Sequence, residues 1–159
     1  MGGFLKSVVG SVALLLHTVC AVGSVGMVSP FIPNQDKTLG IQLPDVRLLN
    51  DDGTPFRLSE LKGKPLLISP VFATCKMTCG PMTHNLKSAL PVDWKLGSDY
   101  NILTLTFDPA DDFEVMRALR EQHSLPKEWK LAVGDTEEIR KLLEALDFRY
   151  MTMDQDGFS

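Results

Sequence analysis

Two cysteines lie four positions apart, where an apolar run gives way to a segment compatible with a helix. Three residues separate Cys75 from Cys79, and the apolar run Pro65–Phe72 precedes them. Two thiols at this spacing can close a disulfide, bind a soft metal ion, or act as a nucleophile and its resolving partner. A bridge across so short a loop constrains the unfolded chain little, which argues against a purely structural disulfide.

The composition fits a single globular domain. The chain has 159 residues, of which 44% are hydrophobic and 23% charged, a profile typical of one domain with one core. The net charge is −4. This balance argues against a nucleic-acid-binding protein, because such a protein normally carries a basic face.

Residues 1–28 predict an export segment. Lys6 is the only charged residue among them, apart from the usually neutral His17. Such a segment is typical of a signal peptide or of an N-terminal membrane anchor. Cys20 raises the further possibility of lipoprotein processing, but Val19 is bulky where a small residue is expected. We therefore expect the domain to be exported, to the periplasm or the outer face of the inner membrane.

Export changes the interpretation of the cysteine pair. In an oxidising compartment, Cys75 and Cys79 would pair as a disulfide unless a partner reduced them or a metal ion occupied them. A functional thiol pair in that compartment therefore needs a reductant.

After a proline-containing linker at residues 29–39, the domain at residues 40–159 alternates strand and helix patterns. Strands are expected at residues 41–49, 54–58, 65–72, 101–107, 129–133 and 148–153. Helices are expected at 81–90, between a cap at Asp111 or Asp112 and Leu125, and at 136–146. This order predicts an N-terminal β-hairpin and a central mixed sheet flanked by helices.

The end of the sequence predicts an incomplete sheet. Residues 154–157 indicate a hairpin turn, and almost no return strand follows it. We therefore expect a C-terminal hairpin strand and a final helix to be missing. Residues 148–153 would then form an exposed strand edge.

The predicted topology places the cysteines at the carboxyl end of a central strand. Open α/β sheets usually bind their ligands at that edge. Asp108 ends the next long strand and is expected at the same edge, where it could support the thiol site. Alternatively, Asp108 only forms the turn before Pro109.

The other potential metal ligands are less favoured. Met77 lies between the cysteines, and Met82 fits the core face of the helix, so direct ligation by either thioether is not expected. His84 follows Cys79 by five positions and would point about 140° away from it on a helix. His123 lies near a helix C-terminus, where the helix dipole favours a cation. We interpret both histidines as residues without a ligand role.

The sequence around the cysteines resembles a known family. The run Pro70–Met82 is similar to the Cys-x-x-x-Cys-x-Pro signature of the Sco/SenC family, and residues 61–65, 106–112 and 129–135 add to the similarity. The resemblance extends from about residue 40 to the end of the sequence. It implies an α/β domain with a thioredoxin-like fold.

The same resemblance implies a copper-binding assembly factor for cytochrome c oxidase. Copper, as Cu(I) or Cu(II), would be bound by the thiolates of Cys75 and Cys79 and by one histidine. The protein would deliver it to the dinuclear site in the copper-bearing subunit of the oxidase, or reduce the cysteines of that site. Its other partner would be a thiol reductant or a copper donor. In the family, the histidine follows a segment like Phe148–Ser159, so a third ligand is expected beyond Ser159.

A thiol-disulfide oxidoreductase of thioredoxin type, tethered to the membrane, is the main alternative. In it, one cysteine attacks and the other resolves. Such enzymes use two intervening residues, and the three found here favour the metal site without excluding redox chemistry. A peroxiredoxin-like peroxidase is less favoured, because its resolving cysteine is usually distant. If Cys79 lies in the first turn of its helix, the amide dipoles there favour its thiolate.

Overall fold

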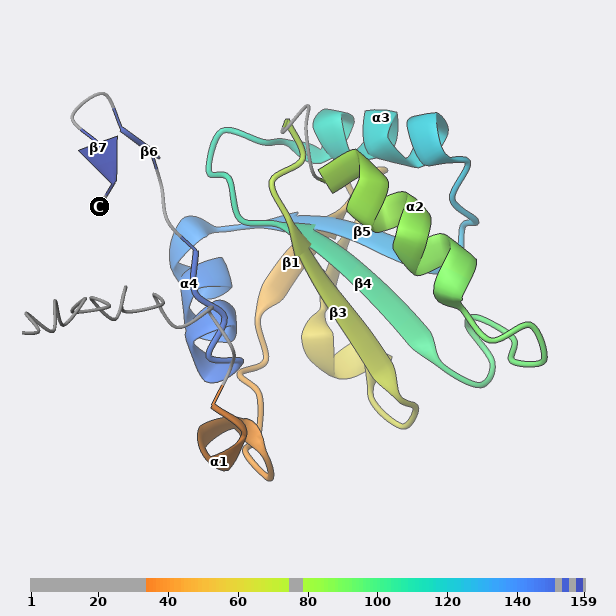
Figure 1. The fold of residues 1–159 in the computed structure, drawn as a ribbon, viewed down its shortest axis with the longest axis horizontal. Coiled ribbons are helices and arrows are strands. Elements are labelled where there is room, and N and C mark those ends of the chain that lie inside the picture. The colour runs from red at the N-terminus through yellow and green to blue at the C-terminus, as the bar shows by residue number, and fades with distance from the viewer. Residues whose placement is uncertain (1–33, 75–78, 151–152, 155–156, 159) are drawn as a thin grey trace, which may run out of the picture. The chain divides into compact units, whose positions relative to one another are not determined.

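A five-stranded mixed sheet forms the centre of the domain (Figure 1). The computed structural model describes residues 34–74, 79–150, 153–154 and 157–158. The strands are β1 (Arg47–Asn50), β2 (Pro55–Arg57), β3 (Leu66–Val71), β4 (Asn101–Thr106) and β5 (Trp129–Gly134). Their order across the sheet is β2-β1-β5-β4-β3. Strands β3, β4 and β5 are parallel, and β1 runs antiparallel to β2 and β5, so the predicted mixed sheet is confirmed.

Helices cover both faces of this sheet. They are the 3₁₀-helix η1 (Leu58–Leu61), α2 (Cys79–Ala89), α3 (Phe113–His123) and α4 (Thr136–Ala145). The short helix α1 (Gln35–Thr38) buries none of its residues. Residues of α2 and α3 pack into one hydrophobic cluster, and residues of η1 and α4 pack into another. Figure 1 shows α2 and α3 side by side and α4 apart from them.

The interior strand β4 contributes to both clusters. Ile102 packs with the α2 and α3 cluster, whereas Leu103 and Leu105 pack with the η1 and α4 cluster. Side chains of a strand point alternately to opposite faces, so a strand covered on both faces is buried along its length. On the α2 and α3 side, the buried Trp129 indole donates a hydrogen bond to Thr104 Oγ1 at 2.9 Å. The polar end of this large side chain therefore has a partner inside the core.

The N-terminal hairpin forms as the sequence predicts. Strands β1 and β2 pair antiparallel, with Leu48 opposite Phe56. Gly53 in the turn between them has φ 81°, a conformation that favours glycine. The Asp51 carboxylate in the same turn accepts a hydrogen bond from Arg120 Nη2 of α3 at 2.9 Å. The turn is therefore tied to the helix layer.

Two aspartates begin the later helices. Asp112 Oδ1 accepts hydrogen bonds from the backbone N–H groups of Glu114 and Val115, so Asp112 rather than Asp111 caps α3. Asp135 caps α4 through the N–H of Glu137. Each carboxylate satisfies N–H groups that lack partners at a helix start.

The predicted strand over residues 148–153 is wrong. Phe148 to Tyr150 form no strand, and the chain instead has a separate two-stranded sheet of β6 (Met153–Asp154) and β7 (Gly157–Phe158). This pairing confirms the hairpin turn and shows a return strand of two residues. Helix α4 ends in a tight turn, with φ 48° at Asp147 and a hydrogen bond from Phe148 N to Leu143 O.

The aromatic residues after α4 pack onto the sheet instead of extending it. The rings of Phe148 and Tyr150 lie 5.8 and 4.6 Å from the Phe107 ring, between centroids. Apolar residues at alternate positions are typical of a strand, but the same spacing lets side chains without strand structure pack onto a sheet. The alternation of Phe148 and Tyr150 therefore predicted a strand that does not form. The edge strands of the five-stranded sheet are β2 and β3.

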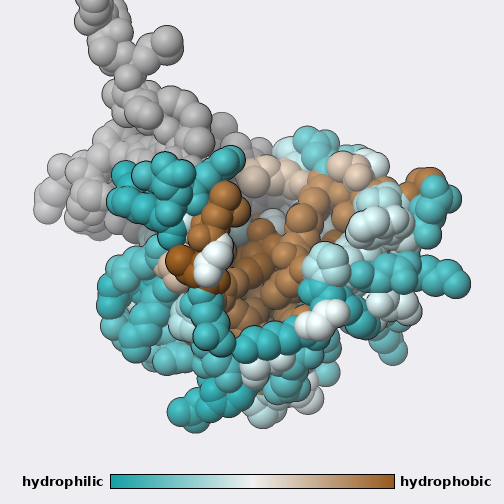
Figure 2. Space-filling view, turned by 90° about the horizontal axis from the view of Figure 1, so that it is seen from below, coloured by the Kyte–Doolittle hydropathy of each residue, from teal (hydrophilic) through white to brown (hydrophobic). Residues whose placement is uncertain are grey.

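One surface of the molecule carries an apolar hollow. Figure 2 shows hydrophobic residues lining it and hydrophilic residues around its rim. The cluster on the α4 side includes several hydrophobic residues that are only partly buried, namely Leu43, Leu66, Ile68, Phe107, Leu146 and Phe148.

The predicted export segment at residues 1–28 lies outside the described residues and stays a prediction. Within the described part of the chain, no helix is long and apolar enough to cross a membrane. The predicted linker at residues 29–39 includes the short helix α1, whose cap is Asn34. The backbone N–H of Asn34 donates to Asp147 Oδ2 at 2.7 Å, which ties this segment to the end of α4.

Candidate thiol site

The two predicted thiol residues lie at a junction between a strand and a helix. Strand β3 ends at Val71, a turn follows at Ala73 and Thr74, and α2 begins at Cys79. Residues 75–78 and the Cys79 side chain lie outside the described residues, so the ligand roles of the cysteines, the role of Met77 and a disulfide between the cysteines stay predictions. The expected strand-to-helix change is confirmed on both sides of this segment.

A buried carboxylate holds the strand end of the junction. The backbone N–H of Ala73 donates to Asp111 Oδ2 at 3.1 Å, and the Thr106 hydroxyl donates to the same oxygen at 2.5 Å. Asp111 is only 8% exposed. Its other oxygen, Oδ1, is buried without a hydrogen-bond partner among the residues described. Asp111 therefore fixes the turn that leads to Cys75.

The electrostatic setting of Asp111 reflects this burial. Loss of water around the carboxyl group raises the pKa of Asp111, and the nearby Asp108 charge raises it further. The hydrogen bonds from Thr106 and from the Ala73 backbone act in the opposite direction, and burial outweighs them. The sequence interpretation considered Asp111 only as a helix cap and missed this role. The feature of the sequence that could have indicated this role is the position of Asp111, three residues after Asp108 and just beyond a buried strand.

Asp108 lies beside the same turn. The Thr74 hydroxyl donates to Asp108 Oδ2 at 3.4 Å, and Oδ1 accepts from the backbone N–H of Ala110 at 2.9 Å. Asp108 thus shapes its own turn and also contacts the residue before Cys75. The structure places it at the expected sheet edge, and a supporting role toward a bound metal stays a prediction.

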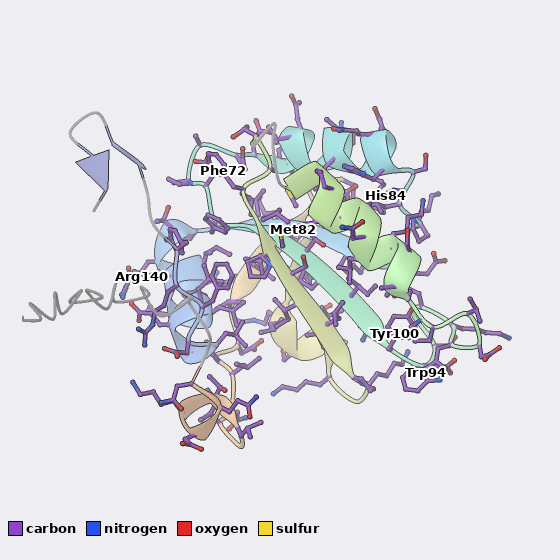
Figure 3. All side chains as sticks on the ribbon, viewed as in Figure 1. Phe72, Met82, His84, Trp94, Tyr100 and Arg140 are labelled. Carbon is purple, nitrogen blue, oxygen red and sulfur yellow. The ribbon has the colours of Figure 1, made fainter. Side chains whose placement is uncertain are left out.

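The helix side of the junction differs from the sequence prediction at Met82. Met82 is 55% exposed, so its expected place on the core face of the helix is wrong. The core-facing stripe of α2 contains Thr83, which is 2% exposed, and continues to the partly buried Leu86 and Leu90. Met82 lies one position, or about 100°, away from this stripe. Figure 3 labels Met82 on α2.

A cleft of about 730 Å³ opens between the thiol junction, α2 and α3. Ala73 and Thr74 line it on the strand side, and Gly80 lines it on the helix side. Both histidines that the sequence interpretation set aside, His84 and His123, also line this cleft. Figure 3 labels His84 on α2.

The two histidines of the cleft have different surroundings. The side chain of His84 is exposed, whereas His123 is half-buried. Nε2 of His123 is buried, and within the described part of the chain it has no hydrogen-bond partner. The ring lies against α2, because Nε2 and Cε1 are each 3.8 Å from the position that a Cβ would take at Gly80.

The start of α2 favours an anionic ligand or thiolate. Its first backbone N–H groups have no partners within the helix, and the helix dipole adds partial positive charge there. Cys79 is the first residue of α2, as the sequence argument requires. Among the described side chains, no three His, Cys, Asp or Glu residues gather closely enough to hold a metal ion. The side chains of Cys75 and Cys79 lie outside the described residues, so this statement does not cover them.

Comparison with known proteins adds information on the whole domain. A family model described as SCO1/SenC matches residues 40–158. No protein with a curated description matches the chain. A solved structure from Aquifex aeolicus VF5, described as an electron transfer protein, is 34% identical over 76% of this chain and 73% of its own, with a TM-score of 0.69.

Two further solved structures share the fold at lower identity. ScoI of Bradyrhizobium japonicum, with copper bound, is 23% identical over 74% of this chain and 76% of its own, with a TM-score of 0.59. BsSco, a member of the Sco family of cytochrome c oxidase assembly proteins with a disulfide switch, is 24% identical over 67% of this chain and 63% of its own, with a TM-score of 0.56. These likenesses show an α/β thioredoxin-like fold, which confirms the predicted fold class.

Proposed function

The chain belongs to the SCO1/SenC family, and we propose that it is a copper-binding assembly factor for cytochrome c oxidase. Copper is the cargo, held by the thiolates of Cys75 and Cys79 and handed to the dinuclear copper site of the oxidase subunit that carries it. The observation that carries this proposal is the family match over residues 40–158, which includes a cysteine pair whose second member begins α2.

The donor set suits this cargo. Thiolates are soft ligands that favour Cu(I), and an imidazole is compatible with either oxidation state of copper. The partial positive charge of the helix dipole at the start of α2 favours the thiolate form of Cys79, which is the form that binds metal. Bound copper would in turn protect both sulfurs from disulfide formation.

The aspartates at the strand end support the site by orienting its first residues. Asp111 accepts a hydrogen bond from the backbone of Ala73, and Asp108 accepts one from the Thr74 hydroxyl. These contacts fix the chain just before Cys75. Ordering this backbone in advance lowers the entropy lost when a metal ion binds.

Reduction of the oxidase cysteines is the second function that we propose, because the same helix start favours a reactive thiolate. One cysteine thiolate attacks a sulfur of the substrate disulfide and forms a mixed disulfide, releasing the first substrate thiolate. The second cysteine then attacks the mixed disulfide and releases the second substrate thiolate. The chain is left with a disulfide between Cys75 and Cys79, which an external thiol reductant must reduce.

We further propose that the domain works outside the cytoplasm. The support is the uncharged run that follows Lys6 in residues 1–28, which is typical of a signal peptide or membrane anchor. In this location, the partners are the copper-bearing oxidase subunit and a thiol reductant or copper donor.

Copper titration tests the main proposal. The reduced full chain is titrated with Cu(I) under anaerobic conditions, in competition with a chromophoric chelator. The wild-type chain should bind one copper ion tightly, whereas Cys75→Ala, Cys79→Ala and the double variant should lose that binding. Cys20→Ala is the matched control and should bind like the wild type. Wild-type binding no tighter than that of the double variant contradicts the copper function.

The reductase function has its own assay. The wild-type chain should reduce a model protein disulfide in the presence of a thiol reductant, at a rate above that of the double cysteine variant. Equal rates remove this function and leave the copper proposal standing.

A further inference from the structure

A second cleft, of about 770 Å³, opens at the carboxyl end of β5. Strand β5 runs from the end of α3 to the start of α4 (Figure 1). The lining of this cleft includes the residues that cap both helices, together with apolar surface from Leu49 and Phe113. Four carboxylates and one guanidinium line it, which gives a formal charge of −3, and we call it the acidic cleft. Its charged residues are Asp111, Asp112, Asp135, Glu138 and Arg47.

Three carboxylates of the acidic cleft keep free acceptor atoms. Asp112 and Asp135 cap their helices through Oδ1, and within the described residues Oδ2 of each accepts no hydrogen bond. Glu138 Oε2 accepts the backbone N–H of Arg47 at 3.2 Å. None of these three side chains forms an ion pair with another described residue. Their charges are therefore available to a cation from outside the chain.

Asp111 adds a buried carboxylate to the acidic cleft. It is 8% exposed, and its Oδ1 is shielded from solvent without a hydrogen-bond partner among the described residues. The donors to Oδ2, the Thr106 hydroxyl and the Ala73 N–H, are both neutral. A buried charge in a protein is normally paired with an opposite charge or a metal ion, and no described cation pairs with Asp111. A cation that enters the cleft would supply this missing charge.

The spacing of the carboxylates favours an extended cationic ligand over a metal ion. Among the described residues, which include all four of these carboxylates, no three His, Cys, Asp or Glu side chains lie close enough to hold a metal ion. The apolar surface between the charges includes Leu49, which is 39% exposed. Lys and Arg side chains combine an apolar stem with a cationic end. A basic segment with apolar residues therefore matches both parts of the lining.

We propose that the acidic cleft docks a basic segment of a partner protein, in which Lys or Arg residues alternate with apolar ones. The basic side chains pair with the four carboxylates, and the apolar ones cover Leu49 and Phe113. Charge complementarity of this kind speeds the encounter and selects the partner. The inference does not depend on the copper function, because it uses no residue of the thiol segment. Asp111 nevertheless connects the two regions, since its Oδ2 holds the turn before that segment.

A triple variant that removes charge tests the docking site. The full chain is titrated into a capped Lys-Leu-Lys-Leu-Lys peptide that carries a neutral fluorophore, and fluorescence anisotropy measures binding. D112N/D135N/E138Q should bind at least ~10-fold more weakly than the wild type, as expected when three exposed ion pairs are lost. Asn caps a helix as well as Asp does. Gln keeps an oxygen that can accept the Arg47 N–H, so the variant should fold.

Two controls separate docking from general attraction between charges. D93N/E121Q/E128Q removes the same charge at exposed positions outside the cleft and should bind like the wild type. Equal losses in the two triple variants, or no loss in either, overturn the proposal. A Lys-Gly-Lys-Gly-Lys peptide should bind at least ~5-fold more weakly, because it buries no leucine side chains on the apolar lining. Equal binding of the two peptides would mean recognition of charge alone and would overturn the proposal of a protein partner.

Amide resonances of the ¹⁵N-labelled wild-type chain locate the peptide without any substitution. The N–H groups of Glu114 and Glu137 donate to the two capping carboxylates, so their resonances should shift when the Lys-Leu-Lys-Leu-Lys peptide binds. The N–H of Thr54 donates to the Asp52 carboxylate, outside the acidic cleft, and its resonance should stay in place. A shift at Thr54 without shifts at Glu114 and Glu137 places the peptide elsewhere and overturns the proposal.

Discussion

The two ends of the thiol segment are held in different ways. At the strand end, directional hydrogen bonds to Asp111 and Asp108 fix Ala73 and Thr74. At the helix end, only a Cβ added at Gly80 would come within ordinary contact distance of the His123 ring, and an open cleft lies beside it. The strand end therefore sets the path of the chain into Cys75, and the helix end borders an open cleft.

The largest effect that tests this contrast is expected from Asp111→Ala. The substitution leaves the Ala73 N–H and the Thr106 hydroxyl without their shared acceptor inside the protein. Unpaired buried polar groups cost about 1–3 kcal/mol each, so the free energy of unfolding should fall by about 3 kcal/mol. Urea denaturation measures this loss, and Cu(I) affinity should fall with it because the turn before Cys75 is released.

Asp112→Ala is the matched control for that variant. Asp112 is the adjacent residue, but it is exposed and caps α3 instead of holding the thiol turn. Loss of such a cap costs about 1 kcal/mol, and Cu(I) affinity should not change. Equal losses of stability and of affinity in the two variants would show that the strand end is not held in the way described.

The pH dependence of stability gives a second test of the strand end. Burial raises the pKa of Asp111 in the folded protein above its unfolded value. The folded state then binds a proton more readily than the unfolded state over the interval between the two pKa values. The contribution of Asp111 to stability is therefore fully present below about pH 4, near the unfolded pKa of an aspartate, and declines as pH rises through the folded pKa.

Asp111→Asn isolates this contribution, because the amide does not titrate. The unfolding free energy of the wild type minus that of D111N should decrease as the pH rises from the acid range toward neutrality. Chemical denaturation at a series of pH values measures the difference. A difference that stays constant, or grows with pH, would contradict a raised pKa at this site.

The sequence predicted the periodic elements and failed where a contact came from far along the chain. Strand β4 and the stripe of α4 were found because their apolar residues recur at fixed intervals. No such interval reveals that Asp111 accepts the N–H of Ala73, 38 residues earlier. The same limit applies to His123. The sequence predicted its position near the end of a helix, but not that its ring would lie close to Gly80 of α2.

Two other errors came from patterns that fit more than one structure. Met82 shares a spacing of four with Leu86 and Leu90, but the buried stripe of α2 contains Thr83 in its place. Phe148 and Tyr150 alternate like strand residues, and they cover the sheet through Phe107. Hydrophobic spacing indicates which residues share a face. It does not indicate whether a polar residue such as Thr83 occupies one of the buried positions. It also does not indicate whether residues that share a face, such as Phe148 and Tyr150, form a strand.

The smallest expected effect, and one of opposite sign, comes from Gly80→Ala at the helix end. The added Cβ would lie 3.8 Å from the His123 ring, which is an ordinary contact, and alanine favours a helix over glycine. The free energy of unfolding should rise by about 0.5–1 kcal/mol. Gly97→Ala is the control, since φ is +84° there and a Cβ would lie 3.2 Å from Glu128 Cγ, so it should destabilise the chain. A loss of stability in G80A as large as that in G97A would mean that the helix end is packed as rigidly as the strand end, and the contrast between the two ends would fail.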